Sequence, residues 1–334
     1  MNNAPPLPRE LQVEVTGACN LRCHMCLVRY RPPLDRVHGS LSYEEFLALV
    51  DANPSLERLT LQGLGEPLLV PHLVDMVRYA AARGIDVGFN CNGTLLTRDK
   101  AEALVDAGLG WLHVSLDGAT AATYEAIRDG ARFDRVCRNI RGLVEVKRAT
   151  GSDRPELQLV FVAMRRNVHE LPAIVQLAHD VGVDAVWVQN LSHSFSDTDP
   201  AGDYVDIRSY TEKEALWQRP DRFATVCFEE ARRRAEQLGV DLRLPRLDEP
   251  APARRPHGTP ACDWPWRSAY VNHDLTVQPC CMVMGSDRAR LGDLRASTFD
   301  EVWTSEPYRR FRDGLLGDEP PDVCRGCSSY HRTF

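Results

Sequence analysis

Short apolar segments alternate with amphipathic helical patterns over residues 11–190. The six expected strands cover residues 11–16, 59–62, 86–91, 111–116, 157–163 and 185–189. Most of these strands are followed by a helical pattern, one of them continuous over residues 121–147, and Gly84, Gly108 and Gly182 end three of the helices. Ser42 with Glu45 three residues later predicts a capping box at the start of the first helix. Strands that alternate with helices form a parallel sheet with helices outside it. Because the connections between such strands are right-handed, we expect the sheet to curve into a partial (β/α)6 barrel of the α/β class.

Composition excludes several classes of protein. The chain has 334 residues and a net charge of -7, and its length suits one large domain or two ordinary ones. No apolar run approaches the ~18 residues that span a bilayer, and the N-terminal segment lacks the features of a signal peptide. We therefore expect a cytoplasmic protein with no membrane partner, and the acidic balance argues against a nucleic-acid partner.

Eleven cysteines in a reducing compartment indicate metal binding or thiol chemistry rather than disulfides. Cys19, Cys23 and Cys26 form a C-x3-C-x2-C motif just after the first strand. An iron–sulfur cubane usually takes four cysteines, so three thiolates would leave one iron open to a further ligand. The alternative is a zinc site completed by His24 or by a distant residue, although structural zinc favours C-x2-C pairs.

This motif, after the first strand of a parallel barrel, resembles that of the radical S-adenosylmethionine (SAM) superfamily. The resemblance implies that the three cysteines bind a [4Fe-4S] cluster whose open iron chelates the amino and carboxylate groups of SAM. One electron from the cluster would then cleave SAM to a 5'-deoxyadenosyl radical, which abstracts a hydrogen atom from the substrate. An external one-electron donor, a flavodoxin or a ferredoxin, is implied as a partner.

A glycine-rich turn after the second strand strengthens the resemblance. Residues 63–67, with the sequence GLGEP, are similar to the superfamily's GGEP turn. Gly65 lets the backbone approach a ligand closely. In the superfamily, the carboxylate at the position of Glu66 accepts a hydrogen bond from the ammonium of SAM.

Later strand ends carry further matches. Asn92 lies in a segment that resembles the superfamily's TNG motif, with Cys91 in place of the usual threonine. Ser115 matches a serine that contacts the cofactor, and Arg128 matches an arginine that pairs with the cofactor carboxylate, a role that suits the guanidinium fork. Val188 lies where the superfamily packs backbone and an apolar side chain against adenine. The matches follow one another along residues 10–190.

A second group of cysteines follows residue 260. A closing C-x2-C pair is a strong metal-ligand signal. The group consists of Cys262, Cys280, Cys281, Cys324 and Cys327. Neighbouring side chains on an extended backbone point in opposite directions, so we expect Cys280 rather than Cys281 to face a metal. Four cysteines then complete a site with no open position.

This tail resembles the shortened SPASM module called a twitch domain. The resemblance implies an auxiliary [4Fe-4S] cluster held by Cys262, Cys280, Cys324 and Cys327, with zinc as the alternative. One departure is Leu275, which occupies the position of a glycine in the usual turn. A second is that no further cysteines follow, as they would in a full SPASM domain.

The chain divides into four parts on this reading. A tail covers residues 1–10, the TIM-like partial barrel 11–190, a substrate loop, helix and linker 191–260, and the auxiliary module 261–334. The polar loop after the sixth strand lies at the edge that carries the chemistry in parallel barrels. It is either a substrate loop or a solvated connector.

Four thiols remain outside the two ligand sets. Cys91 and Cys281 adjoin the predicted sites and are candidate hydrogen-atom donors, although alternation places Cys91 on the strand face opposite Asn90 and Asn92. Cys137 and Cys227 lie in helical patterns and are expected to be buried. In the loop after the sixth strand, three polar residues could bind a polyol or an amine: His193, Asp197 and Asp199.

The expected function is that of a radical SAM oxidoreductase that acts on a small polar molecule in natural product biosynthesis. A sugar, aminocyclitol or aminoglycoside would undergo dehydrogenation of a carbinol, or epimerisation. The twitch layout resembles superfamily members in which the second cluster takes the substrate's electron, and the chain begins almost at the first strand, without a peptide-recognition domain. The alternative is modification of a ribosomally synthesised peptide or protein. An electron-transfer or assembly protein without turnover is a third reading, which the complete cofactor set disfavours.

Overall fold

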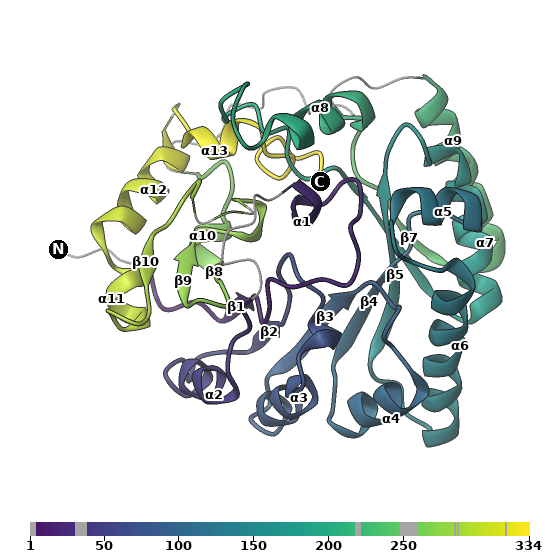
Figure 1. Ribbon diagram of the computed structural model, residues 1–334, viewed down its shortest axis with the longest axis horizontal. Coiled ribbons are helices and arrows are strands. Elements are labelled where there is room, and N and C mark those ends of the chain that lie inside the picture. The colour runs from purple at the N-terminus through teal and green to yellow at the C-terminus, as the bar shows by residue number, and fades with distance from the viewer. Residues whose placement is uncertain are drawn as a thin grey trace.

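A curved, mostly parallel sheet organises the molecule (Figure 1). The computed structural model describes residues 5–30, 39–217, 222–247, 259–283, 285, 287–317 and 319–334. The strand order is β10-β9-β8-β1-β2-β3-β4-β5-β6-β7. The parallel strands of the barrel are β1 (Glu10–Val13), β2 (Arg58–Thr60), β3 (Asp86–Cys91), β4 (Trp111–Ser115), β5 (Glu156–Ala163), β6 (Ala185–Asn190) and β7 (Asp241–Arg243). The six predicted strands are β1 to β6, and the α/β partial barrel is confirmed.

Helices cover the outer face of the sheet in an arc (Figure 1). They are α2 (Tyr43–Asp51), α3 (Leu73–Ala81), α4 (Arg98–Asp106), α6 (Phe133–Thr150), α7 (Leu171–Val181) and α9 (Arg222–Leu238). Ser42 and Glu45 form the predicted capping box at the start of α2. The helical pattern predicted over residues 121–147 is divided into α5 (Ala121–Ile127) and α6, because the intervening turn contains Gly130 with a left-handed φ of 92°.

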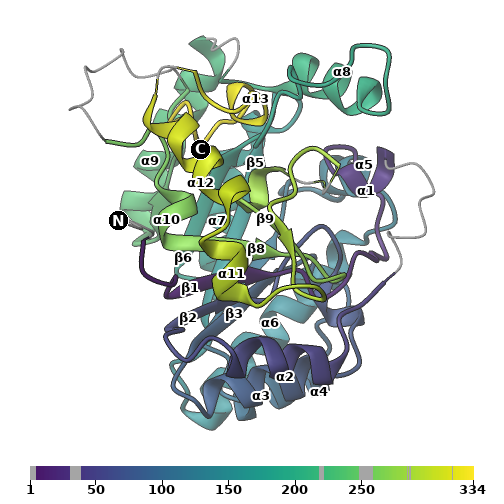
Figure 2. The same ribbon diagram turned by 90° about the vertical axis from the view of Figure 1, so that its left-hand side faces the viewer.

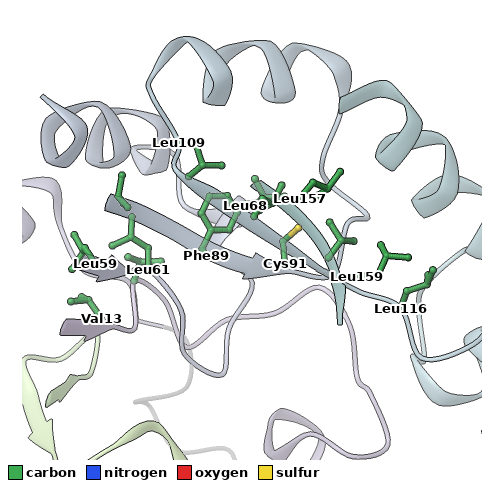
Figure 3. Close-up of a cluster of buried hydrophobic side chains, with 14 of the residues drawn as sticks. Val13, Leu59, Leu61, Leu68, Phe89, Cys91, Leu109, Leu116, Leu157 and Leu159 are labelled. Atoms are coloured by element: carbon green, nitrogen blue, oxygen red, sulfur yellow. The ribbon is translucent and has the colours of Figure 1, made fainter. Parts of the chain in front are cut away.

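The hydrophobic core lies between the sheet and these helices. Figure 3 shows one part of it, which includes Val13, Leu59 and Phe89 from β1 to β3 and Leu157 from β5. The first three of these side chains are fully buried, and each such burial stabilises the fold by about 1.5–3 kcal/mol. Since side chains alternate along a strand, fixing this outward set also fixes which residues face the lumen of the barrel.

The inward-facing set is largely polar. The parallel register aligns Gln12 with Thr60 and Asn90 with His113. His113 is in turn aligned with Gln158. The ring of His113 lies 4.6 Å from that of Trp111 and 5.7 Å from that of Trp187. The lumen wall therefore carries aromatic rings and amide side chains at the same levels of the sheet.

The C-terminal module continues the barrel sheet instead of standing apart from it. β8 (Ser268–Val271) pairs in parallel with β1, and β9 (Thr276–Gln278) pairs antiparallel with β8. Leu275 occupies the hairpin turn with a left-handed φ of 63°, the conformation for which the usual glycine is suited. The remaining elements are α10 (Trp264–Arg267), β10 (Gly292–Asp293), α11 (Phe299–Trp303), α12 (Glu306–Leu316) and α13 (Asp322–Arg325) (Figure 2).

Two short helices stand near the carboxyl ends of the strands, α1 (Leu27–Tyr30) and α8 (Val205–Glu214). The predicted loop after the sixth strand contains α8, and residues 218–221 lie outside the described part of the chain. Most of the predicted linker, residues 248–258, lies outside it as well. Among the described residues, no helix has the length and apolar character needed to span a bilayer.

Candidate active site and metal centres

The loop after β1 carries the first three cysteines. Its backbone is held against the end of α5, since Arg22 N donates to Asp129 O and His24 N to Ile127 O, both at 3.0 Å. Cys26 N closes a tight turn on Cys23 O at 3.1 Å. The three sulfurs are therefore presented from a single rigid loop.

The sulfur environment fits a bound cluster. Burial raises the pKa of Cys19 to about 11 and that of Cys23 to about 12, so their thiolates require a cation at neutral pH. Polar hydrogens already point at these sulfurs: Leu21 N lies 3.4 Å from Cys19 Sγ, and Arg128 Nη1 lies 3.9 Å from Cys23 Sγ. N–H donors of this kind stabilise the sulfurs of iron–sulfur clusters. The described residues contain no group of three ligands gathered as for a single metal ion.

Glu66 is buried beside this loop and joins two strand ends. Its carboxylate accepts hydrogen bonds from Leu68 N at 3.1 Å and from Asn92 N at 2.8 Å. Burial raises the pKa of Glu66 from 4.5 to about 7, against the two backbone hydrogen bonds, which lower it. Asn92 also donates to Asn20 Oδ1 at 2.9 Å, so the turn after β3 supports the cysteine loop directly.

This raised pKa predicts a pH-dependent stability. Folded Glu66 keeps its proton up to about pH 7, whereas an unfolded glutamate releases it near 4.5, so its contribution is present at low pH and lost as pH rises. We expect the apoprotein to lose roughly 3 kcal/mol of unfolding free energy relative to Glu66→Gln between pH 5 and 8. Urea unfolding of both proteins across this range measures the difference. A difference that does not change with pH contradicts the prediction.

Gly65 is required by backbone contact. A Cβ at this position would collide with the carbonyl oxygens of Thr16 and Ala18 in the cysteine loop, which cannot rotate away as a side chain would. The close approach that the sequence predicted toward a ligand is thus, in the structure, an approach to the loop that carries Cys19.

We expect Gly65→Ala to displace the cysteine loop, to lower the unfolding free energy by about 1–3 kcal/mol and to reduce the iron bound after anaerobic reconstitution. Iron assay and thermal unfolding measure the two effects. Gly142→Ala is the matched control, because a Cβ at Gly142 meets no atom within 4 Å. It should retain iron and gain about 0.5–1 kcal/mol from helix propensity. Full iron content in Gly65→Ala would count against the steric argument.

Arg128 is held by a buried ion pair at the end of α5. Its Nε donates to Asp117 Oδ2 at 2.6 Å, and the Asp117 side chain is completely buried. Asp117 Oδ1 accepts Val162 N at 2.7 Å, which ties the pair to β5. Ser115, half-buried, lies on the lumen side of β4. The guanidinium is thus fixed between the Cys23 sulfur and the ends of β4 and β5.

Val188 differs from the expectation. Its side chain is fully buried and belongs to the core between sheet and helices, in line with Val186 on the same strand. Alternation therefore turns Trp187 and Gln189 toward the lumen. Only the backbone of Val188 is available on the lumen side, because its apolar side chain is used for packing.

The auxiliary cysteines come together from three segments. Burial and the neighbouring thiols raise the pKa of Cys280 and of Cys324. Cys281 also interacts with the charges of Cys327 and Cys262. It begins a short 3-10 turn at residues 281–283, where the strict alternation of an extended strand no longer applies. Cys280 and Cys281 are thus both close to the group, and adjacency alone does not separate them.

The loop after β6 holds this module against the barrel. His193 forms an isolated antiparallel bridge with Cys327. Burial and the charge of Arg288 lower the pKa of His193 to about 4, so its imidazole is neutral. Asp197 is 7% exposed and pairs with Arg288 at 2.7 Å. These two residues are therefore structural partners of the module, and among the three polar residues predicted for ligand binding Asp199 alone is outside this network.

The three thiols outside the two cysteine groups are all buried. Cys91 lies in the hydrophobic core with Leu159 and Leu116 (Figure 3). Strand alternation therefore turns Asn90 and Asn92 to the other face. Cys137 and Cys227 are also buried, as predicted.

A carboxylate that the sequence analysis did not select joins the two halves of the site. Glu14 is 1% exposed and accepts hydrogen bonds from Leu64 N at 2.7 Å and from Tyr270 Oη at 3.0 Å. His273 Nδ1 lies 2.8 Å from its other oxygen. The sequence feature that could have identified it is a glutamate between Val13 and Val15 at a strand end. A charged residue in such a position is rarely buried without a partner.

Two known protein families match separate parts of this chain. The family description "Radical SAM superfamily" matches residues 13–154, and "Iron-sulfur cluster-binding domain" (SPASM) matches residues 262–328. The tungsten-containing aldehyde ferredoxin oxidoreductase cofactor-modifying protein of Pyrococcus furiosus is 30% identical and covers 90% of this chain and 82% of its own length. The chain belongs to the radical SAM superfamily. SAM and a [4Fe-4S] cluster are therefore its cofactors, with an auxiliary iron–sulfur cluster in place of the zinc alternative.

Other radical SAM proteins are similar over the whole chain. The AdoMet-dependent heme synthase of Methanosarcina barkeri is 30% identical, covering 98% of this chain and 92% of its own length. Among solved structures, Streptococcus suis SuiB bound to S-adenosylmethionine has a TM-score of 0.72 at 14% identity, over 99% of this chain and 73% of that one. The enzyme anSMEcpe with bound AdoMet gives 0.65 at 17% identity, over 98% and 85%. These structures share the fold.

Proposed function

We propose that this radical SAM enzyme is an oxidoreductase that removes a hydrogen atom from a small polar substrate and dehydrogenates a carbinol. The observation that supports the proposal is that a second group of cysteines, drawn from three segments, lies beside the loop after β6, to which the bridge between His193 and Cys327 joins it. A cluster with four protein ligands has no open iron, so it suits electron transfer rather than SAM binding.

The chemistry balances with such an acceptor. Loss of a hydrogen atom from carbon, a proton from oxygen and one electron converts a carbinol into a ketone. When bound, the cluster of the first site supplies the electron for reductive cleavage of SAM, and the auxiliary cluster supplies an acceptor for the substrate's electron. An external flavodoxin or ferredoxin would deliver the first electron.

The residues of the first site are assigned to SAM in this proposal. Cys19, Cys23 and Cys26 hold the first cluster. Glu66 binds the ammonium of SAM, for which its buried carboxylate is suited once a cation compensates the charge. The other contacts are made by Gly65, Asn92, Ser115, Arg128 and the backbone of Val188. Asp117 fixes the Arg128 guanidinium so that the remaining N–H groups can pair with the cofactor carboxylate.

The lumen supports a polar substrate. Gln158 on β5 and Gln189 on the neighbouring β6 are half-buried on its walls, as is Asn90 on β3. Neutral amides both donate and accept hydrogen bonds, as recognition of hydroxyl groups requires. Relatives that match nearly the full chain are named for heme synthesis and for cofactor modification, which supports a small molecule over a peptide.

Epimerisation is the second outcome within this proposal, and it needs a hydrogen-atom donor. Cys281 lies beside the auxiliary cysteines, whereas Cys91 points into the core. Cys281 is therefore the better candidate of the two.

Anaerobic assays with candidate sugars, aminocyclitols and aminoglycosides test the proposal. We expect 5'-deoxyadenosine and a ketone in equal amounts, with deuterium from the substrate C–H bond recovered in 5'-deoxyadenosine. Solvent deuterium in the product, lost in Cys281→Ala, would instead indicate epimerisation. Turnover only with a peptide substrate would overturn the small-molecule proposal.

A further inference from the structure

One buried guanidinium lies where the segments of the auxiliary group meet. The side chain of Arg288 is 4% exposed, and its Nη1 donates to Val283 O at 2.7 Å, two residues beyond Cys281. Its Nη2 contacts both oxygens of Asp197 at 2.7 and 2.8 Å. Arg288 thus connects the segment of Cys280 and Cys281 to the loop after β6.

The third segment, which carries Cys324 and Cys327, is attached through His193. Nδ1 of His193 accepts Phe195 N at 2.8 Å, so its hydrogen is on Nε2, which donates to Val323 O at 2.7 Å. Nε2 also lies 3.2 Å from Arg288 Nη2. Because both of these nitrogens are donors, this approach is a contact and not a hydrogen bond.

The hydrogen-bond count of Arg288 is incomplete. Nη1 and Nη2 have carbonyl and carboxylate acceptors, but Nε is buried without a partner among the described residues. A buried donor without an acceptor costs about 1–3 kcal/mol, and more when it is charged. The Nε–H is therefore available to an acceptor on a group bound by the neighbouring cysteine segments.

The environment of this guanidinium is apolar, which strengthens its electrostatic interactions. The guanidinium lies 5.0 Å from the ring of Phe195 and 5.6 Å from that of Tyr204, which keep water away. Both Arg288 and Asp197 lie close enough to the thiol of Cys324 to interact with it electrostatically, and Arg288 does so with Cys327 as well.

We propose that Arg288 is a positioning residue for the auxiliary cluster: it donates its Nε–H to a cluster sulfur and holds the reduction potential of the cluster high enough to accept an electron. Reduction adds a negative charge, which a nearby cation and a charge-assisted hydrogen bond stabilise. Asp197 orients the guanidinium and offsets part of its charge. The inference rests on the proposed assignment of Cys262, Cys280, Cys324 and Cys327 as the ligands.

A redox titration followed by electron paramagnetic resonance tests the inference. The full chain with Cys19, Cys23 and Cys26 replaced by alanine isolates the auxiliary cluster. In this background we expect Arg288→Gln to lower the ratio of reduced to oxidised cluster about tenfold at a fixed potential, a shift of about 59 mV for a one-electron couple. Asp197→Asn should shift the midpoint upward. Arg288→Lys, which keeps the charge but lacks the Nε–H, should fall between Arg288→Gln and the unsubstituted chain.

The controls separate a failure of the ligand assignment from a failure of the role proposed for Arg288. Arg290→Gln removes a more exposed arginine paired with Asp293 and should leave the midpoint unchanged. Absence of iron from the background variant itself would refute the ligand assignment, and this inference with it. An unchanged midpoint in an iron-replete Arg288→Gln overturns the role of Arg288 alone. If Arg288→Gln fails to hold iron, Asp197→Asn decides: a midpoint that is unchanged or lower overturns the role.

Discussion

Replacement of Cys19, Cys23 and Cys26 together by alanine is expected to reduce 5'-deoxyadenosine formation to the level of a reaction without enzyme. Without the three thiolates no cluster forms at the first site, so no electron reaches SAM. Iron should fall from about eight to about four per chain, as expected for the loss of one of two cubanes. Anaerobic product analysis and iron assay measure both quantities.

The matched control is Cys227→Ala. Cys227 is a buried thiol of α9, outside both groups, and its replacement should keep both iron and SAM cleavage. Thermal unfolding of the apoproteins shows whether the triple variant remains folded. SAM cleavage that survives in the folded triple variant would refute the assignment of the first site.

Asp117→Asn is expected to cost about 3–5 kcal/mol of unfolding free energy, because it leaves the buried charge of Arg128 without its partner. The ion pair is short, at 2.6 Å, and the Asp117 side chain is fully shielded from water. The second oxygen of Asp117 also accepts a hydrogen bond from Val162 N. Asparagine can keep that acceptor, but its NH2 group then faces the guanidinium, donor against donor. SAM affinity should fall as well, since the guanidinium is no longer held in one orientation.

An exposed ion pair provides the comparison. Glu145 and Arg98 lie 3.3 Å apart with side chains 62% and 54% exposed, and Glu145→Gln should cost less than about 1 kcal/mol. Denaturant unfolding of the apoproteins gives both values. Similar costs for Asp117→Asn and Glu145→Gln would show that burial does not make the Arg128 pair exceptional.

Local pattern was sufficient for much of the barrel. β1 to β6 follow from apolar alternation, and Ser42 with Glu45 marked the start of α2. β7 was missed, since its three residues contain two charges and depend on β6 for pairing. The break between α5 and α6 was missed too, because one glycine within a helical pattern does not reveal its φ.

Side-chain direction was predictable where strand alternation was applied. The rule placed Cys91 opposite Asn90 and Asn92, and the structure agrees. The same rule was not applied to Val188, whose alignment with the buried Val186 would have turned it away from the lumen. For Cys280 and Cys281 the rule does not decide, because Cys281 begins a 3-10 turn, and the choice of Cys280 as the ligand stays a prediction.

The sequence by itself determined the order of the strands and the residue types at their ends, and thereby the superfamily and its cofactors. These are local properties, since periodicity and spacing act within a few turns of the chain. Tertiary structure alone decided that β8 pairs with β1, that Glu14 meets Tyr270 and His273, and that Arg288 is buried between Asp197 and Val283. Such contacts join segments that are far apart in the chain. A buried charge is stable only with a partner, and which residue becomes that partner is decided when the segments pack together.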